Sequence, residues 1–476
     1  MNQLPSGTYG MVLPQAIPNE IEGKEAEYPA ESQSFPNDIT KVFFRRPDYN
    51  ELINRIPNIQ RLFGNDPNYA IHPYRRNLRL GNVSNRATRK KVSNKLKAVH
   101  GIVSPNNFPN NTPLPAIHLP HLGVDFHDLY NEDVKRQLRR VPVRTMLAHV
   151  LTVLQSVDFL TNQEDRESYI HGDIRPPNLM IRPATGQITL IDFDWLRELS
   201  MFSEEYPIKS LYHTPPELLL YGKRQLPGRH DKVLFASQQV YQKPDERQLR
   251  RLRQLSTIEP YNSNINTYCA QSFRTFDYIK HLYQSEDVFR TIVGDAINDS
   301  IEYYADLDRP YLDSFHTFDS YGLGQNLMEL FCTIYPTSTT IYAEELDQLT
   351  AMLATRLIKG GEPYTPAELR ASAVAIFNMV QGVLIPLCSL DLRTRKRIKN
   401  VIEFASQLVN SLDPVNPVED NQPSNENLTR NINFHRNRIA SAEAKGENTR
   451  AHRNHVRFLM AQRGYGKKRS KRTRKR

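Results

Sequence analysis

One stretch of the sequence, residues 170–195, decides the fold: it reads IHGDIRPPNLMI from residue 170 and, after a gap of six residues, ITLIDFDW from residue 188. The apolar runs LMI and ITLI lie on either side of Pro183 and Gly186, a pattern that is typical of two β-strands joined by a turn. We therefore expect a β-hairpin over 179–191. A hairpin returns the chain to its starting end, so residues that border it come together.

Three polar side chains lie near the ends of this predicted hairpin. Asn178 precedes it and Asp192 follows it, so both are expected to face one site. Amide and carboxylate oxygens are ligands that Mg²⁺ takes when it also holds nucleotide phosphates. Asp173 supplies a carboxylate that can accept a proton from a hydroxyl nucleophile. The spacing of these residues therefore predicts a site for phosphoryl transfer.

The order His171-Gly172-Asp173, then Asn178, then Asp192-Phe193-Asp194 resembles the catalytic loop and the Asp-Phe-Gly turn of the protein kinase superfamily. The resemblance implies an α+β, two-lobed protein kinase-like fold with a strand-rich small lobe and a helical large lobe. It also implies roles for single residues: catalytic base for Asp173, contact with the γ-phosphate for Arg175, and Mg²⁺ ligands for Asn178 and Asp192.

Two positions depart from the kinase pattern. Gly172 stands where the family usually has an arginine that reads a phosphorylated activation loop, so we expect no control by that route. Asp194 stands in place of the glycine. The His-Gly-Asp order and the acidic residue after Asp-Phe also resemble aminoglycoside and choline kinases. A small-molecule kinase on the same scaffold therefore remains an alternative.

Downstream segments also resemble protein kinases. Residues 209–217 follow the family's Gly-Thr-x-x-Tyr-x-Ala-Pro-Glu segment, which implies that Ser210 touches the catalytic aspartate. The last residue of that segment, Glu217, is then implied to pair with a buried arginine, for which Arg393 and Arg395 are candidates. Small-molecule kinases usually lack these elements, so they favour a protein kinase.

A further segment, from Asp319 onward, resembles the central helix of the large lobe. The resemblance implies that the Asp319 carboxylate accepts hydrogen bonds from the backbone of the catalytic loop. Between this segment and the one at 209–217 the chain is much longer than the family usually is. We expect a helical insertion over 222–315, with helices at 246–257, 273–283 and 288–304, that docks a partner or covers the substrate groove.

The amino-terminal third supplies candidates for the nucleotide side of the site. Gly7, Gly10 and Val12 resemble the end of a glycine-rich loop, in which a missing Cβ lets the backbone approach phosphates. Residues 39–44 begin by alternating apolar and polar side chains, as a strand would. Lys41 in this strand resembles the lysine that holds the α- and β-phosphates of ATP.

A short helix is predicted over 48–55, with Asp48 as its N-cap and Pro57 as its break. Glu51 on this helix is the candidate partner of Lys41. Residues 117–125 resemble the last small-lobe strand and the hinge. Backbone groups near Leu119 and Leu122 are expected to face the adenine.

The resemblance divides the chain into three regions. Residues 1–118 are expected to form the small lobe, 119–412 the large lobe with its insertion, and 413–476 a linker and a basic tail. Residues 421–476 hold 16 basic and 3 acidic residues, whereas the whole chain carries a net charge of +10. The basic character is therefore a property of the tail.

The end of the tail, from Lys467 to Arg476, has eight cations in ten positions. Such a run repels itself and has nothing apolar to bury, so we do not expect it to fold alone. It suits nucleic acid, which it would bind through counterion release, or a nuclear import receptor. A tail that only solvates the protein is the third alternative.

Cysteine usage and hydropathy indicate an intracellular protein, in the cytoplasm or the nucleus. The three cysteines are well separated and lack metal-site spacing, which favours a reducing compartment. No apolar run of 18 residues is present and no secretory leader is recognised, so neither a membrane partner nor secretion is expected. The insertion and the basic terminus resemble kinases encoded by large DNA viruses, which would place the chain in a host cell or a virion.

The sequence thus predicts a serine/threonine protein kinase that uses ATP and Mg²⁺ and acts on a protein with a Ser or Thr acceptor. Two alternatives stay open. One is a small-molecule phosphotransferase similar to aminoglycoside or choline kinases. The other is a non-catalytic scaffold with a kinase fold that binds nucleic acid or is packaged in a virion.

Overall fold

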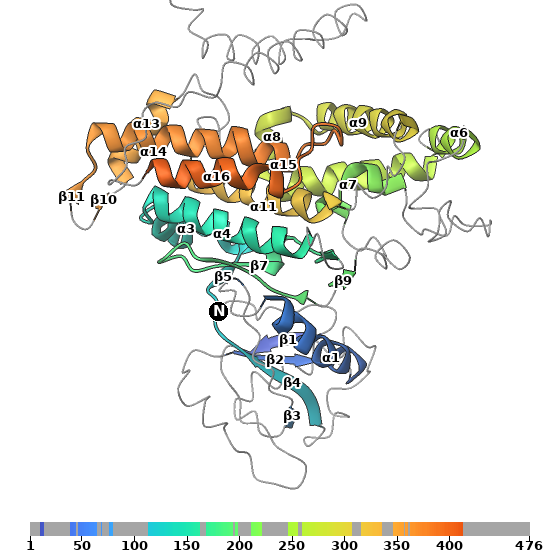
Figure 1. Cartoon of the computed structure of the whole chain (residues 1–476), viewed down its shortest axis with the longest axis horizontal. Coiled ribbons are helices and arrows are strands. Elements are labelled where there is room, and N and C mark those ends of the chain that lie inside the picture. Colours follow the sequence, from blue (N-terminus) through green and yellow to red (C-terminus); the bar gives the residue numbers. More distant parts are fainter. Residues whose placement is uncertain are drawn as a thin grey trace, which may run out of the picture.

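The computed structural model describes residues 10–13, 39–43, 46–63, 68, 76–79, 113–161, 168–193, 196–198, 211–220, 246–255, 259–306, 316–335, 346–356, 358–359 and 362–412. These residues form helices and short antiparallel strands, which agrees with the expected α+β class. Figure 1 shows a smaller part built on a sheet, the sheet part (residues 10–119), and a larger part that is mostly helical, the helical part (residues 124–412).

The sheet part is built on an antiparallel sheet with the strand order β1-β2-β4-β3. The strands are β1 Gly10–Leu13, β2 Ile39–Phe43, β3 Arg76–Arg79 and β4 Pro113–Leu119. The strand predicted over 39–44 is confirmed as β2, with residue 44 outside the described residues. Thr40 and Val42 are buried, whereas Lys41 between them is half-buried on the other face.

Helix α1, Arg46–Phe63, packs against this sheet. The prediction of a helix over 48–55 was right in kind and wrong in extent. Asp48 lies in the first turn instead of forming the N-cap, and the helix continues through Pro57. An interior proline costs about 3 kcal/mol relative to alanine. Burial of Ile56, Ile59 and Leu62 around it outweighs that cost, because each such side chain contributes about 1.5–3 kcal/mol.

The chain passes from the sheet part to the helical part between β4 and β5, Val124–Asp125. Gly123 in this crossing has a φ of 106°, and a Cβ on it would lie 2.0 Å from the carbonyl oxygen of Ile181. Both facts require glycine at this position. Strand β5 pairs with β7, Leu179–Ile181, which pairs in turn with β8, Ile188–Leu190. The predicted hairpin is therefore confirmed, and Gly186, with a φ of 74°, lies in its turn.

The helical part is assembled from helices that differ widely in length. They are α3 Glu132–Leu138, α4 Val143–Thr161, α6 Glu246–Leu255, α7 Glu259–Thr275, α8 Asp277–Tyr283, α9 Glu286–Asp306, α11 Phe318–Ile334, α13 Leu346–Arg356, α14 Pro366–Met379, α15 Ile385–Leu387 and α16 Lys399–Ser411. A π-helical turn, Val380–Leu384, joins α14 to α15.

Shorter elements connect these helices. The 3₁₀ turns are η4 Phe126–Tyr130, η5 Pro176–Asn178, η7 Leu211–His213 and η8 Pro216–Leu220. Two small antiparallel pairs complete the set: β6 Tyr169–Ile170 with β9 Arg197–Glu198, and β10 Ile358–Lys359 with β11 Glu362–Pro363.

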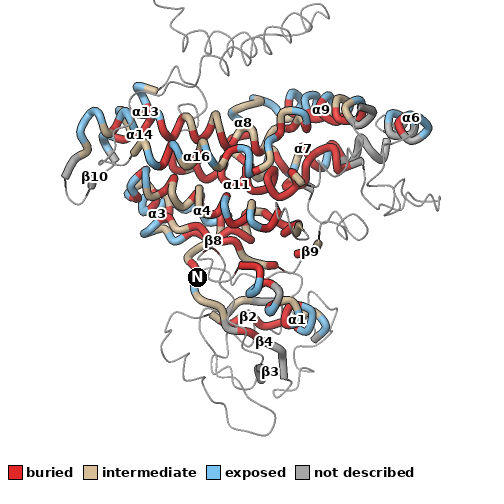
Figure 2. Tube along the Cα trace, viewed as in Figure 1, coloured by how far each residue is buried: buried red, intermediate tan, exposed pale blue. Residues whose placement is uncertain are grey.

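Helix α11 lies at the centre of the helical part. Every residue from Phe318 to Cys332 is buried, and Figure 2 shows buried segments concentrated through the middle of this part. The apolar stripe of α4 also faces the core, as its helical spacing predicts. The fully buried members of that stripe are Leu147, Val150, Leu154, Val157 and Leu160.

The segment expected to be a helical insertion contributes α6 to α9. The helix predicted over 273–283 begins instead at Glu259 and is divided at Phe276 into α7 and α8. The sequence pattern missed residues 259–272 because they are mostly polar. Contacts of aromatic side chains are among those that join the insertion to the rest of the helical part. The ring of Phe276 packs edge-on against Tyr212 at a centroid distance of 5.9 Å, and the hydroxyls of Tyr268 and Tyr321 share a hydrogen bond.

Two helical segments of the described chain, Val143–Thr161 and Pro366–Leu387, are long and apolar enough to cross a bilayer. In the most apolar 18-residue window of each segment, 50% of Val143–Thr161 and 56% of Pro366–Leu387 is buried inside the structure. Because core helices share this pattern, the two segments are weak evidence for a membrane partner. The expected absence of such a partner stays a prediction.

The proline in α1 generates a stability prediction. Replacing exposed Pro57 with alanine restores one backbone donor to the helix and should raise the free energy of unfolding by about 2 kcal/mol, allowing for the greater entropy of the unfolded chain. Chemical denaturation measures the change. Gln60→Ala, on the same exposed side of α1, is the control and should stay within about 0.5 kcal/mol. A less stable Pro57→Ala protein would contradict this account.

Candidate functional site

The predicted catalytic loop is fixed from below by helix α11. The carboxylate of Asp319 accepts the backbone N–H of His171 at 2.7 Å and that of Gly172 at 3.0 Å. Gly322, one turn further along α11, has no room for a side chain, because a Cβ would lie 2.7 Å from the carbonyl oxygen of Ile174. Burial raises the pKa of Asp319 to about 7, and the two N–H donors oppose this rise. The predicted hydrogen bonds of Asp319 are confirmed.

The ring of His171 positions the loop from the side. Its Nδ1 accepts the backbone N–H of Asp173 at 3.3 Å, so its Nε2 carries the proton and donates to the carbonyl oxygen of Ile191 at 3.0 Å. Burial lowers the pKa of His171 to about 4, which keeps the ring neutral. His171 therefore links the predicted catalytic loop to the residue just before Asp192.

The carboxylate of Asp173 is largely buried and has two close donors. Asn178 Nδ2 lies 2.9 Å from Asp173 Oδ2, and the Arg175 guanidinium Nε lies 3.0 Å from the same oxygen. Burial raises the pKa of Asp173 to about 6; the neighbouring Asp192 carboxylate adds to the rise, and Arg175 and Asn178 oppose it. A carboxylate with such a pKa is mostly ionised at pH 7 and still basic enough to accept a proton.

The hairpin brings Asn178 and Asp192 together, as its pattern predicts. The carbonyl oxygen of Asn178 accepts the backbone N–H of Ile191 at 3.0 Å, so positions 178 and 192 lie side by side. Asn178 uses its Nδ2 to donate to the backbone oxygen of Asp173 at 2.8 Å, which leaves Oδ1 as the atom that could bind a cation. Asp192 has a φ of 66°, which lies in the left-handed region that residues other than glycine adopt infrequently.

These two residues fit a Mg²⁺ ion by their donor chemistry. An amide oxygen and a carboxylate are hard oxygen ligands, and Mg²⁺ typically takes one or two carboxylates and completes its shell with phosphates and water. Among the described residues, no group of three or more His, Cys, Asp or Glu side chains gathers to hold a metal. A divalent cation here would therefore depend on a phosphate ligand as well as on Asn178 and Asp192.

Lys41 reaches this cluster from the sheet part. Its Nζ lies 3.2 Å from Asp192 Oδ1, and the two side chains are 17% and 28% exposed. The predicted partner, Glu51, is exposed on α1 and forms an ion pair with Arg55, one turn further along the same helix. The ion pairs shown for these residues are thus Lys41–Asp192 and Glu51–Arg55. Glu51 and Arg55 are four residues apart on one helix, so their side chains are neighbours and pair within α1.

The candidate residues for the nucleotide occupy the sheet and the crossing. Gly10 and Val12 lie on β1, with Val12 opposite Lys41 in the strand register, whereas Gly7 lies outside the described residues. Leu119 packs against the core of the sheet part, and Leu122 is buried in the crossing. These candidates therefore lie on the sheet and in the crossing, in the part of the structure from which Lys41 reaches Asp192.

Sequence reasoning missed two residues of this region. His213 is 1% exposed, and its Nε2 lies 3.3 Å from Asp173 Oδ1. Burial lowers the pKa of His213 to about 3, so the contact is not an ion pair. The only sequence signal was a histidine within the segment at 209–217, and the residue expected to touch Asp173, Ser210, lies outside the described residues.

The second missed residue is Asn68, which is 4% exposed. Its Nδ2 donates to Ser156 Oγ on α4 at 2.9 Å, and its carbonyl oxygen accepts the backbone N–H of Leu190 on β8 at 3.0 Å. Asn68 therefore anchors the segment after α1 to the helical part. No pattern in the neighbouring sequence marks it.

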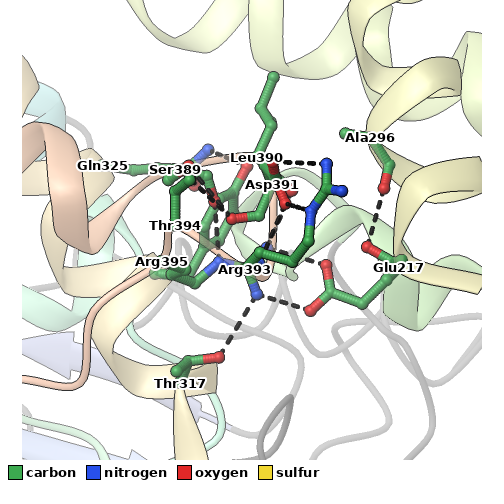
Figure 3. A network of polar contacts seen from close by, with 12 residues as sticks. Glu217, Ala296, Thr317, Gln325, Ser389, Leu390, Asp391, Arg393, Thr394 and Arg395 are labelled. Atoms are coloured by element: carbon green, nitrogen blue, oxygen red, sulfur yellow. Dashed lines mark hydrogen bonds and ion pairs between the residues drawn. The ribbon is translucent and has the colours of Figure 1, made fainter. Parts of the chain in front are cut away.

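Glu217 lies at the far end of the segment that contains His213. Figure 3 shows its carboxylate facing the guanidinium of Arg395, with both side chains 0% exposed and N–O distances of 2.6 and 2.8 Å. Arg395 also donates to the carbonyl oxygens of Ser389 and Leu390. Of the two candidates, Arg395 is therefore the partner of Glu217, whereas Arg393 pairs with Asp299 and Asp391 near the surface.

This choice between two arginines can be tested by matched substitutions. Arg395→Met leaves the Glu217 carboxylate buried without its cation and should lower the free energy of unfolding by about 3–5 kcal/mol. Arg393→Met removes a 44% exposed side chain and should cost about 1 kcal/mol or less. Equal losses of unfolding free energy in the two variants would show that the buried Glu217–Arg395 pair stabilises the fold no more than the exposed contacts of Arg393.

Two comparisons with known proteins complete the description of the site. No protein-family model matches the chain, and no curated protein matches its sequence.

Proposed function

We propose that the chain is a two-lobed protein kinase-like phosphotransferase that transfers the γ-phosphate of ATP to serine or threonine hydroxyls of a protein. The sheet part would be the small lobe and the helical part the large lobe. The observation that carries the proposal is the convergence of Asp173, Asn178 and Asp192, with Arg175 and Lys41 beside them. These are the groups that positioning and electrostatic stabilisation of phosphoryl transfer require.

Each residue has a defined task in this proposal. Asp173 accepts a hydrogen bond from the acceptor hydroxyl and takes its proton as the new P–O bond forms. Arg175, at 3.0 Å from that carboxylate, supplies positive charge beside the transferred phosphoryl group. Lys41 is held by Asp192 and is in position to bind a phosphate oxygen. A Mg²⁺ ion bound by Asn178 and Asp192 would neutralise charge on the phosphates.

The buried supports of the site favour a protein kinase over the small-molecule alternative. The sequence resemblance ties the Asp319 contacts and the Glu217–Arg395 pair to protein kinases, and both contacts are present with short distances. The burial of Asp173 near Asp192 argues against a non-catalytic scaffold. Burying Asp173 beside a second carboxylate is unfavourable, and such perturbed groups concentrate at functional sites.

The first functional prediction concerns the base. Asp173→Asn keeps the shape of the side chain but cannot take a proton, so phosphate transfer from radiolabelled ATP to generic protein acceptors should fall by at least ~10²-fold. Exposed Asp128→Asn is the control and should keep the parent rate. Undiminished transfer by Asp173→Asn would contradict the assigned role. Transfer to sugars or amino alcohols but never to proteins would support the small-molecule alternative.

The second functional prediction concerns pH. Because only the ionised form of Asp173 accepts a proton, and its pKa is raised to about 6, kcat/KM for ATP should fall as the pH drops through about 6 and level off above it. Initial rates between about pH 5 and pH 8 measure this limb. A flat profile across that range would contradict the prediction.

A further inference from the structure

The segment between the hairpin and the insertion brings one additional side chain to Asp173. His213 ends the 3₁₀ turn η7 and has 1% of its surface exposed. Among the described residues, neither of its ring nitrogens has a hydrogen-bond partner. A buried polar group without a partner costs about 1–3 kcal/mol. Such a group calls for an explanation, and a polar atom at 3.3 Å from Nε2 supplies one.

That atom is an oxygen of the proposed catalytic base. His213 Nε2 lies 3.3 Å from Asp173 Oδ1, within hydrogen-bonding distance but without the orientation of a hydrogen bond. Catalytic hydrogen bonds are often long or misaligned before substrates bind and shorten in the complex. The imidazole ring packs almost at right angles to the rings of Tyr212 and Phe318, at centroid distances of 5.6 and 6.4 Å, so these rings help to fix its position.

Resting on the proposed function, we infer that His213 is a positioning residue for phosphoryl transfer: its neutral ring donates Nε2–H to Asp173 Oδ1 in the reactive complex and fixes the base toward the acceptor hydroxyl. Arg175 and Asn178 hold the carboxylate from the side of the catalytic loop. His213 holds it from the segment that lies against the insertion through Tyr212 and Phe276. The base would then have donors from both segments that border it.

The surroundings of His213 exclude a second role as a proton relay. Burial, and next to it the positive charge of Arg175, lower the pKa of the ring. A ring that resists protonation does not take the proton that Asp173 removes. It serves as a donor whose own charge state is constant through the reaction.

The test compares two substitutions that differ in one donor. His213→Phe keeps a planar ring but has no N–H, and kcat should fall by about 10- to 100-fold, the value of a hydrogen bond to a charged group. The KM for ATP should not change, because the polar neighbour of His213 is the base and not a residue assigned to the nucleotide. His213→Gln places an amide N–H near the Nε2 position and should restore kcat toward that of the parent. His149→Phe, at a half-buried histidine on α4, is the matched control and should keep the parent kcat.

Three kinetic outcomes would overturn the inference. They are parent-like kcat in His213→Phe, a rise of KM alone, and equal loss in His213→Phe and His213→Gln. The last outcome would assign His213 to packing or to base chemistry. If His213→Phe also lowers the thermal midpoint, the glutamine variant decides, because rescue by an amide donor requires the hydrogen bond.

A measurement without activity separates this inference from the proposed function. In protein labelled with ¹⁵N-histidine, His213 should carry its proton on Nε2, and the resonance of that proton should move upfield in Asp173→Asn, whose neutral amide is the weaker acceptor. A bare Nε2, or a resonance that is indifferent to Asp173→Asn, would overturn the inference whether or not the parent transfers phosphate. A parent that shows these signals and transfers nothing would contradict the proposed function alone.

Discussion

The contact between Asp319 and the backbone of the loop that carries Asp173 is the interaction on which the rest of the candidate site depends. One carboxylate in the largely buried helix α11 accepts two successive N–H groups, those of His171 and Gly172. Without it, two backbone donors would be buried unsatisfied, at about 1–3 kcal/mol each. Because Asp173 follows directly, the position of this carboxylate is set by a helix in which every residue from Phe318 to Cys332 is buried. The close approach of Gly322 to the loop completes this support.

The charges above this support come from both parts of the structure. Lys41 comes from the sheet, Asp192 from the end of the hairpin, and Asp173 and Arg175 from the loop between α4 and the hairpin. Each carboxylate thus has a cation of its own. A triphosphate would attract the same two cations. Lys41 and Arg175 would then exchange their carboxylate partners for phosphate oxygens, and neither cation would be left buried without a partner.

The sequence revealed best those features of the fold and the site whose residues lie close together along the chain. The hairpin was readable because two short apolar runs and a turn are local signals, and it carries Asn178 and Asp192 with it. The resemblance to kinases pointed to Asp319 and Glu217 across long separations. It left two arginines open, because Arg393 and Arg395 share one turn and only packing against Ser389 and Leu390 distinguishes them.

Other features had no local signal. The partner of Lys41 depends on how the sheet part sits over the hairpin, and Glu51 has a competing cation on its own helix. Helix α1 runs through Pro57 because its apolar face is buried against the sheet, which propensity alone does not show. His213 and Asn68 act through contacts with residues tens of positions away, and neither lies in a distinctive pattern.

The anchoring of Asn68 has a mechanical consequence. The sheet part is held to the helical part at this residue, through Ser156 and Leu190, and again where the chain crosses at Gly123. Phe63 at the end of α1 adds a further link, because its ring packs against that of Phe193 at a centroid distance of 5.1 Å. The separation of Lys41 and Asp192 is therefore set by several contacts between the two parts and not by the chain connection alone.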